Sequence, residues 1–493
     1  MHSFSDFIAP VYDLVIIGGG IIGAGVARDA AMRGLSVALV EKGDFGSGTT
    51  AGSTRLIHGG LRYLEMLDFA LVRMDLRERE ILLRIAPHLV KPLEFLIPFY
   101  NASPWFRFKM RVGLALYDLL SYDKSLPNHR VLSAEEALAE EPALRREGLQ
   151  GAAAYYDAQV SMPERLCLES LLAAEQHGAA VRSYTEVTGA LREQGGRVTG
   201  LHITARETGE QGVLRGRVFV NATGAWFDRV ATRTETAHRS RLRTTKGIHL
   251  TGAPMNRKAS VLFSPVDGRL FFVIPLLGKC WIGTTDTDFS EDPSNVRAEG
   301  ADVEYLLRSV EPFFPGVRNL EIYSSNAGVR ALVRQSGSES SVSRMHKVEE
   351  TQPGMISILG GKITGYRAIA EEATDAVCSR LGRKAACRTH QTLLPNASAG
   401  GEASLDKALY HAVHSEHCWH VSDFLLRRHT SAFAADQGRS IAAEVARQMG
   451  ALLGWDTFRQ QSEIDRFIAE ADRALLFRSE VPEGLRHSPV EPS

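Results

Sequence analysis

The segment 12–44, YDLVIIGGGIIGAGVARDAAMRGLSVALVEKGD, constrains the fold more than any other part of the chain. An apolar run at 14–17 predicts a buried strand, and three glycines follow it directly. Small and apolar residues continue at helical spacing to Met32, and a second apolar run at 36–40 predicts another strand. This order of strand, glycine turn, helix and strand is typical of a Rossmann unit that binds a dinucleotide. We therefore predict an α/β fold.

The glycine spacing in this segment matches the dinucleotide fingerprint Gly18-x-Gly20-x-x-Gly23. Gly18 permits a tight turn, Gly20 lets the backbone approach a pyrophosphate at the helix N-terminus, and Gly23 allows the helix to pack closely on the strand. Glu41 follows the last glycine by 18 residues, which is the usual spacing for an acid that binds ribose hydroxyls. These four residues are therefore predicted to contact a dinucleotide.

The loop at 42–55, KGDFGSGTTAGSTR, is rich in small and hydroxyl residues. Its hydroxyl and backbone N–H groups can form a second cradle, which suits a long cofactor such as FAD. The candidate contacts in this loop are Lys42, Thr49, Thr50 and Ser53. A solvated Gly/Ser loop explains the same composition equally well.

Composition excludes several other classes of protein. The 493 residues suggest two or three domains, and the formal net charge of −1 gives no reason to expect nucleic acid as a partner. Five cysteines without a CxxC pair predict a reducing compartment and no metal site. The N-terminal residues lack the pattern of a secretory signal, and no window is apolar for long enough to span a membrane.

Further segments resemble one family, in order along the chain. They are STRLIHGGLRYLE (53–65), APHLVKPLEFLIPFY (86–100), VNATGAWFD (220–228), TKGIHL (245–250), AGVRALV (327–333), LGGKITGYR (359–367) and SDFLLRR (422–428). With the Rossmann unit, this set resembles the FAD-dependent glycerol-3-phosphate dehydrogenases of the aerobic, respiratory kind. The resemblance implies FAD as cofactor, oxidation of glycerol 3-phosphate to dihydroxyacetone phosphate, and a membrane quinone as electron acceptor.

The same resemblance implies a flavoprotein of the D-amino-acid-oxidase-like kind with three parts. These are a discontinuous FAD-binding domain (9–100, 150–235 and 325–392), a substrate domain with an antiparallel sheet (101–149 and 236–324), and a helical C-terminal domain (405–480). Arg427 and Arg428 in the last part are expected to be structural or dimer contacts, and a homodimer stays open.

Additional cofactor contacts are implied around the flavin. Gly59 and Gly60 would let the backbone lie flat against the ring, where a side chain would clash. The other expected contacts are His58, Val187 (to adenine), Gly224, Gly361, Lys362 and Thr364. A double-glycine turn with no cofactor role is the alternative for residues 59 and 60.

A polyol phosphate carries two negative charges, so its pocket needs fixed cations. The implied substrate contacts are Arg62, Tyr63, Arg344 and Lys362. Arg330 is expected to stabilise the developing alkoxide and to have an acidic partner, because apolar residues flank it. His249 is expected to accept the hydroxyl proton, with its pKa lowered by Arg330, and His58 is the second candidate. A salt bridge to a nearby acid is the alternative role for each cation.

The segment 104–120, PWFRFKMRVGLALYDLL, predicts an amphipathic helix. Its expected apolar stripe, formed by Phe106, Met110, Leu114 and Tyr117, would enter lipid while basic residues meet acidic headgroups. The implied location is therefore cytoplasmic, at the periphery of the inner membrane. A core helix of the substrate domain is the alternative.

Two departures from the family pattern lie near the expected pocket. Ala331 stands where proline is usual, and Gly365 stands where the family often has threonine. They leave another polyol phosphate, such as a four-carbon one, open as the substrate. An oxidase that uses oxygen, an amine or amino-acid oxidase of the same fold, and a flavin-binding RNA-modifying or sensor protein are the remaining alternatives.

Overall fold

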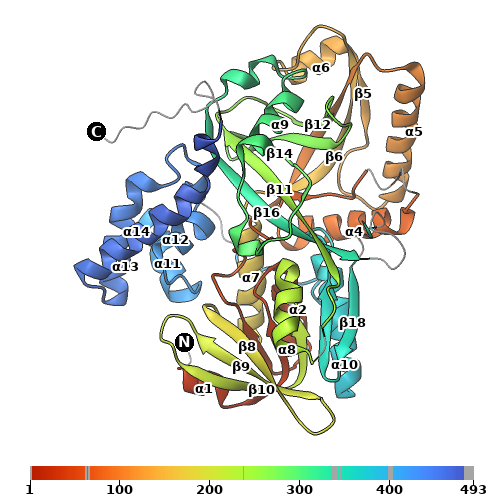
Figure 1. Cartoon of the computed structure of the whole chain (residues 1–493). Coiled ribbons are helices and arrows are strands. Elements are labelled where there is room, and N and C mark those ends of the chain that lie inside the picture. The colour runs from red at the N-terminus through yellow and green to blue at the C-terminus, as the bar shows by residue number, and fades with distance from the viewer. Residues whose placement is uncertain are drawn as a thin grey trace.

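A computed structural model describes residues 3–61, 64, 67–236, 238–334, 342–343, 346–397 and 404–481. Two β-sheets and a separate group of C-terminal helices make up the molecule (Figure 1). The predicted α/β flavoprotein architecture with a helical C-terminal domain is confirmed.

The first sheet contains the predicted Rossmann unit. Its order is β18-β19-β10-β1-β2-β7, and the hairpin β8–β9 joins it through β10. The strands are β1 (Val11–Ile17), β2 (Val37–Val40), β7 (Ala180–Arg182), β8 (Thr185–Arg192), β9 (Val198–Ala205), β10 (Gln211–Asn221), β18 (Lys347–Gln352) and β19 (Met355–Leu359). Strands β19, β10, β1, β2 and β7 are parallel, as expected for a dinucleotide-binding sheet.

Helices cover the first sheet, so its central strands are buried. They include α2 (Ile21–Met32), α7 (Pro163–Gln176) and α10 (Tyr366–Leu381), and the shorter α1 (Phe4–Ile8) and α8 (Phe227–Thr234) lie nearby. Helix α2 packs between α7 and α10, and its small residues permit this close approach. A Cβ added at Gly25 would lie 3.0 Å from atoms of Ala370 and Tyr366.

The second sheet is almost entirely antiparallel, with β4 and β12 as its parallel pair among the described strands. Its order is β17-β16-β11-β14-β13-β12-β4-β6-β3, with β15 beside β11 and β5 beside β6. The strands are β3 (Leu56–Ile57), β4 (Val90–Tyr100), β5 (Arg130–Leu132), β6 (Leu149–Val160), β11 (Leu242–Gly252), β12 (Ala259–Phe263), β13 (Leu270–Leu276), β14 (Lys279–Gly283), β15 (Thr287–Asp288), β16 (Ile322–Arg334) and β17 (Val342–Ser343). Its helices are α4 (Phe69–Ile85), α5 (Pro104–Leu120), α6 (Ala134–Glu140) and α9 (Gly300–Val310).

Strand pairing differs from the predicted division into domains. Strands β4, β6 and β16 were expected in the FAD-binding domain, but all three pair within the second sheet. Sequence order alone does not show at which point the chain crosses from one sheet to the other. The exact domain limits stay a prediction.

The C-terminal helices have their own apolar core. They are α11 (Leu405–Ser415), α12 (Val421–Asp423), α13 (Arg439–Leu453) and α14 (Thr457–Arg473), with a π-helical turn at Phe424–Arg428 after α12. In Figure 1 they form the blue group on the left, beside both sheets.

Helix α5 lies on the outside of the second sheet, but the predicted orientation of its apolar stripe is wrong. Leu114 and Tyr117 are buried, and Phe106 and Met110 pack beside them on the core of that sheet. The helix carries further apolar side chains on its exposed side, where Trp105 is 71% exposed. Within the described residues, no helix is both long and apolar enough to cross a membrane.

Candidate active site

One cavity of about 1030 Å³ is lined by residues of both sheets. The first sheet contributes the carboxyl ends of its parallel strands, where α/β folds usually bind their ligands. The second sheet contributes side chains from β12, β13 and β16. This volume lies at the upper limit of ordinary ligand pockets, about 300–1,000 Å³, and it has room for a large cofactor and a small substrate.

The glycine turn has the geometry that its sequence predicts. Gly18 has φ of 106°, and a Cβ there would lie 2.8 Å from the carbonyl oxygen of Ala222. A Cβ at Gly23 would lie 2.0 Å from the carbonyl oxygen of Gly18, so the helix can approach the strand only with glycine here. Gly20 lines the cavity and precedes α2, whose N-terminal N–H groups point into this region.

Glu41 is held at the end of β2 by two backbone amides. Its Oε2 accepts a hydrogen bond from the N–H of Gly19 (2.8 Å), and its Oε1 accepts one from Gly43 (2.9 Å). Burial raises the pKa of Glu41, although these hydrogen bonds oppose the shift. The carboxylate therefore lies on the cavity wall in a fixed orientation, as a ribose-binding acid requires.

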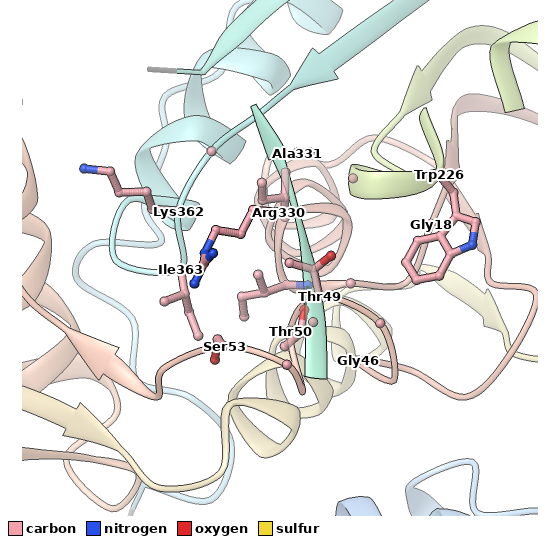
Figure 2. Close-up of a pocket in the computed structure, with 18 of the residues that line it drawn as sticks. Gly18, Gly46, Thr49, Thr50, Ser53, Trp226, Arg330, Ala331, Lys362 and Ile363 are labelled. Carbon is pink, nitrogen blue, oxygen red and sulfur yellow. Dashed lines mark hydrogen bonds between the residues drawn. The ribbon is translucent and has the colours of Figure 1, made fainter. Parts of the chain in front are cut away.

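The loop after Glu41 contributes the predicted hydroxyl groups. Thr50 Oγ1 accepts a hydrogen bond from the N–H of Ile21 (3.1 Å), and Thr49 Oγ1 donates one to the carbonyl of Val329 in β16 (2.8 Å). The loop thus connects the glycine turn to the second sheet. The predicted contacts that line the cavity in this part of the chain are Lys42, Thr49, Thr50 and Ser53, and Figure 2 shows the last three close together.

The turn at 58–60 differs from the prediction. Gly59 is not among the described lining residues: a Cβ there would lie 2.6 Å from both Leu76 and the Tyr117 hydroxyl. Glycine is required at this position by the packing of α4 and α5. His58 and Gly60, which were both expected beside the flavin, do line the cavity.

The other expected cofactor contacts on the first sheet also line the cavity. They are Val187, Gly224, Gly361, Lys362 and Thr364. Thr364 Oγ1 accepts a hydrogen bond from the backbone N–H of His58 (3.2 Å), so the turn after β19 fixes the turn that carries the histidine.

Arg330 extends from β16 into the cavity, and it has the acidic partner that the sequence predicts. Its Nη1 lies 3.0 Å from Asp286 Oδ1, and its Nη2 donates a hydrogen bond to Thr284 Oγ1 (2.8 Å). Figure 2 shows its guanidinium directed towards Ser53 and Ile363. The group is half-buried and oriented, as a cation that binds a charged substrate should be.

Lys362 lines the cavity but is anchored to α4. Its Nζ lies 2.8 Å from Oδ2 of the buried Asp75. Burial raises the pKa of Asp75 to about 6, although the lysine opposes the shift. In Figure 2 the lysine side chain points away from Arg330.

Three predicted substrate contacts, Arg62, Tyr63 and Arg344, lie outside the described residues. One cation that sequence reasoning missed, Arg269, lines the cavity at the start of β13 and donates a hydrogen bond to the carbonyl of Asp286. Its position directly before the apolar strand LFFVIP was the available signal.

The prediction that His249 faces the reaction centre is not supported by its position. His249 is 1% exposed, stacks on Trp281 with ring centroids 4.9 Å apart, and is not among the described lining residues. Its Nε2 lies 3.1 Å from the hydroxyl of Thr54, which does line the cavity. None of the described lining residues belongs to β11, so the imidazole lies behind the cavity wall, next to Thr54.

Burial lowers the pKa of His249 well below its ordinary value, and the charges of Arg330 and Arg55 add to the effect. The unfolded chain binds a proton here near pH 6.5 and the folded chain does not, so stability should fall as pH decreases through that value. Replacing His249 with Gln should remove this contribution. We expect the melting temperature of the variant to fall less steeply from about pH 7 to about pH 5, measured by calorimetry. An equal pH dependence in both proteins would contradict the assignment.

Comparison with known proteins agrees with this geometry. Residues 13–375 match the model of the FAD-dependent oxidoreductase family, and residues 371–460 match that of the C-terminal domain of alpha-glycerophosphate oxidase. A glycerol-3-phosphate dehydrogenase from Synechocystis is 40% identical over 433 residues, 83% of this chain and 78% of the relative. The chain belongs to the FAD-dependent glycerol-3-phosphate dehydrogenase family.

Further similar proteins are another dehydrogenase sequence and two solved structures. An aerobic glycerol-3-phosphate dehydrogenase from Staphylococcus haemolyticus is 35% identical, with 80% of this chain and 73% of the relative covered. The structure of the glycerol-3-phosphate dehydrogenase from Bacillus halodurans, complexed with FAD, has 27% identity and a TM-score of 0.79 over 96% of both chains. The α-glycerophosphate oxidase from Mycoplasma pneumoniae has the same fold, with 19% identity and a TM-score of 0.60 over 78% of this chain and 99% of that one.

FAD is the cofactor of this family, and the cavity fits it. Gly18 and Gly23 allow the tight turn and the close approach of α2, Gly20 lines the cavity where α2 begins, and Glu41 and Val187 line the same cavity. Within the described residues, no group of three or more His, Cys, Asp or Glu side chains could hold a metal ion.

Proposed function

We propose that this protein oxidises sn-glycerol 3-phosphate to dihydroxyacetone phosphate. The observation that carries the proposal is that His58 and the basic side chains Arg269, Arg330 and Lys362 line one cavity together with the dinucleotide-binding turn. A substrate with a phosphate group and an oxidisable hydroxyl needs these elements: fixed positive charge and a group that accepts a proton.

FAD, when bound, supplies the acceptor for the hydride that leaves the carbinol carbon. His58 accepts the hydroxyl proton, so that the C–O bond becomes a carbonyl. Arg330 stabilises the negative charge that develops on this oxygen, because its guanidinium is already oriented by Thr284 and Asp286. Arg269 and Lys362 attract the phosphate, and we assign the same role to Arg62, Tyr63 and Arg344 from the family resemblance.

The polyol is tested by comparing kcat/KM for glycerol 3-phosphate, a four-carbon polyol phosphate and glycerol. We expect glycerol 3-phosphate to be the best substrate and glycerol to be nearly inactive, because the cations then have no anion to bind. Ala331 lines the cavity where the family usually has proline, and this extra space favours the four-carbon compound as the second candidate. If kcat/KM is higher for the four-carbon compound than for glycerol 3-phosphate, the four-carbon compound is the substrate.

We further propose that the protein binds the cytoplasmic membrane peripherally and passes its electrons to a quinone. The support is an exposed apolar group on α5: Trp105 and Phe108 have stacked rings 5.7 Å apart, and Leu119 is 67% exposed. Lys109 and Arg111 on the same helix are also exposed and can meet acidic headgroups.

The rival electron acceptor is oxygen, so the yield of peroxide is compared with the reduction of a soluble quinone analogue. Stoichiometric peroxide with little quinone reduction would make the protein an oxidase.

The membrane proposal predicts that replacing Trp105 and Phe108 with serine weakens binding to vesicles of acidic phospholipid by at least about tenfold, because two large apolar groups no longer enter the lipid. Cosedimentation measures this binding. The matched control is Phe458→Ser, since Phe458 is 83% exposed but lies on α14. Vesicle binding that is unchanged in the double variant would show that α5 is not the contact.

A further inference from the structure

A buried cluster of charges joins the cofactor loop to the C-terminal domain. Asp44 lies in the loop after β2, and its side chain is 1% exposed. Arg428 binds both of its carboxylate oxygens, with Nη2 at 2.7 Å from Oδ1 and Nη1 at 2.8 Å from Oδ2. Arg427 donates a further hydrogen bond to Oδ2 through Nε. Two arginines of the C-terminal domain therefore enclose one aspartate of the cofactor-binding domain.

Both arginines are fixed from their own side as well. Arg427 lies 3.0 Å from Asp423 and 2.7 Å from Glu470, and Arg428 donates hydrogen bonds to the carbonyl of Glu416. Glu470 lies on α14 and also lines the cavity. The C-terminal domain thus reaches the cofactor site directly as well as through Asp44.

Asp44 lies within the part of the loop that forms the cavity wall. Its carbonyl accepts a hydrogen bond from the Ser47 hydroxyl (2.7 Å), and Ser47 lines the cavity. The neighbouring Phe45 packs edge-on against His417 of the C-terminal domain, with ring centroids 5.4 Å apart. Gly46 donates a hydrogen bond to the carbonyl of Gly19 in the dinucleotide turn (3.0 Å). A shift of Asp44 would therefore move residues on both sides of the cofactor cradle.

A second connection runs through Tyr184. Its hydroxyl donates a hydrogen bond to Asp423 Oδ1 (2.6 Å), and its backbone N–H donates one to the carbonyl of Gly43 (3.1 Å). The next residue, Thr185, lines the cavity and binds the carbonyl of Glu41 through its N–H (2.7 Å). Asp423 therefore fixes residues 184–185 through Tyr184, and it fixes the loop 43–47 through Arg427.

We propose that the C-terminal domain is a clamp on the FAD-binding loop, and that Arg427 and Arg428 are positioning residues for FAD retention. A buried bidentate ion pair is sensitive to the loss of one partner, because the other charge is left without compensation in a dry environment. Asp44 could then not stay buried, and the loop 43–47 would open towards solvent. The role in cofactor retention goes beyond the oxidation chemistry, since neither arginine touches the expected position of the substrate.

The test is the rate at which FAD leaves the holoenzyme. FAD release from Arg428→Met is expected to be at least about tenfold faster than from the wild type, followed as the rise in flavin fluorescence after dilution. Arg428→Lys, which keeps the charge but loses the bidentate geometry, is expected to lie between the two. With FAD in excess, kcat/KM for substrate should return to the wild-type value in both variants.

A matched control separates clamping from general destabilisation. Val445 is fully buried in the core of the C-terminal domain and belongs to α13. Val445→Ala should lower the melting temperature without changing the FAD release rate. The proposal is overturned if Val445→Ala releases FAD as fast as the arginine variants do, or if both arginine variants keep the wild-type rate. If Arg428→Met does not fold, the comparison between Arg428→Lys and Val445→Ala decides.

Discussion

Replacement of His58 by Asn is expected to lower kcat/KM for glycerol 3-phosphate by about 10²- to 10⁴-fold, the usual contribution of a general base. His58 is the described histidine that lines the cavity. Thr364 accepts a hydrogen bond from the backbone N–H of His58, and an asparagine at this position keeps that N–H. The ring packs edge-on against Phe272, with ring centroids 6.3 Å apart, and asparagine removes the proton acceptor while the backbone hydrogen bond of the turn is kept.

Steady-state kinetics and the flavin content measure this effect together. His411→Asn, on an exposed position of α11, is the control and should behave as the wild type. Loss of FAD in the His58 variant would assign the residue to cofactor binding instead. A variant that keeps FAD and near-normal kcat/KM would remove His58 from the reaction.

The second large effect is expected from Gly23→Ala, which should be purified with little or no FAD. The added Cβ would lie 2.0 Å from the carbonyl oxygen of Gly18, so α2 or the glycine turn has to move. The atom that the added Cβ meets belongs to the backbone and cannot yield as a flexible side chain can. The flavin-to-protein ratio measures the result, and circular dichroism checks the fold.

Gly113→Ala is the matched control, because a Cβ at Gly113 in α5 would meet no atom within 4 Å. It should retain FAD fully. A full flavin content in Gly23→Ala would mean that the turn at 18–23 is not the cofactor cradle.

The sequence was sufficient to predict the glycine turn and the acid of the dinucleotide-binding unit. Glycine at a positive φ, an acid at the end of the second strand and a helix that starts beside them follow from local sequence rules. Gly18 and Glu41 therefore line the cavity as their spacing predicts. The sequence predicted that Arg330 has an acidic partner, although not which residue, because a charge among apolar residues needs compensation.

The substrate half was harder to predict because it depends on which face of a strand or helix turns inward. His249 and Lys246 both lie on β11 among residues that are nearly all buried, so alternation of polar and apolar residues gives no direction. The sequence around Gly59 likewise gives no sign that this residue faces α4 and α5. Helix α5 has apolar residues on two sides, and only its packing on the second sheet shows that Leu114 is on the inner one.

Long-range ion pairs were also beyond local rules. Asp44 and Arg428 are separated by 384 residues, and neither segment carries a pattern that names the other. Their pairing is decided by how the C-terminal domain docks beside β2, which is a property of the complete fold.

The most direct test of the account is an anaerobic titration of the purified holoprotein with glycerol 3-phosphate, followed through the visible absorbance of FAD. The account predicts that the flavin band bleaches in proportion to added substrate and that dihydroxyacetone phosphate appears in equal amount. A flavin band that stays unchanged under excess glycerol 3-phosphate but bleaches with another polyol phosphate or an amino acid would contradict it.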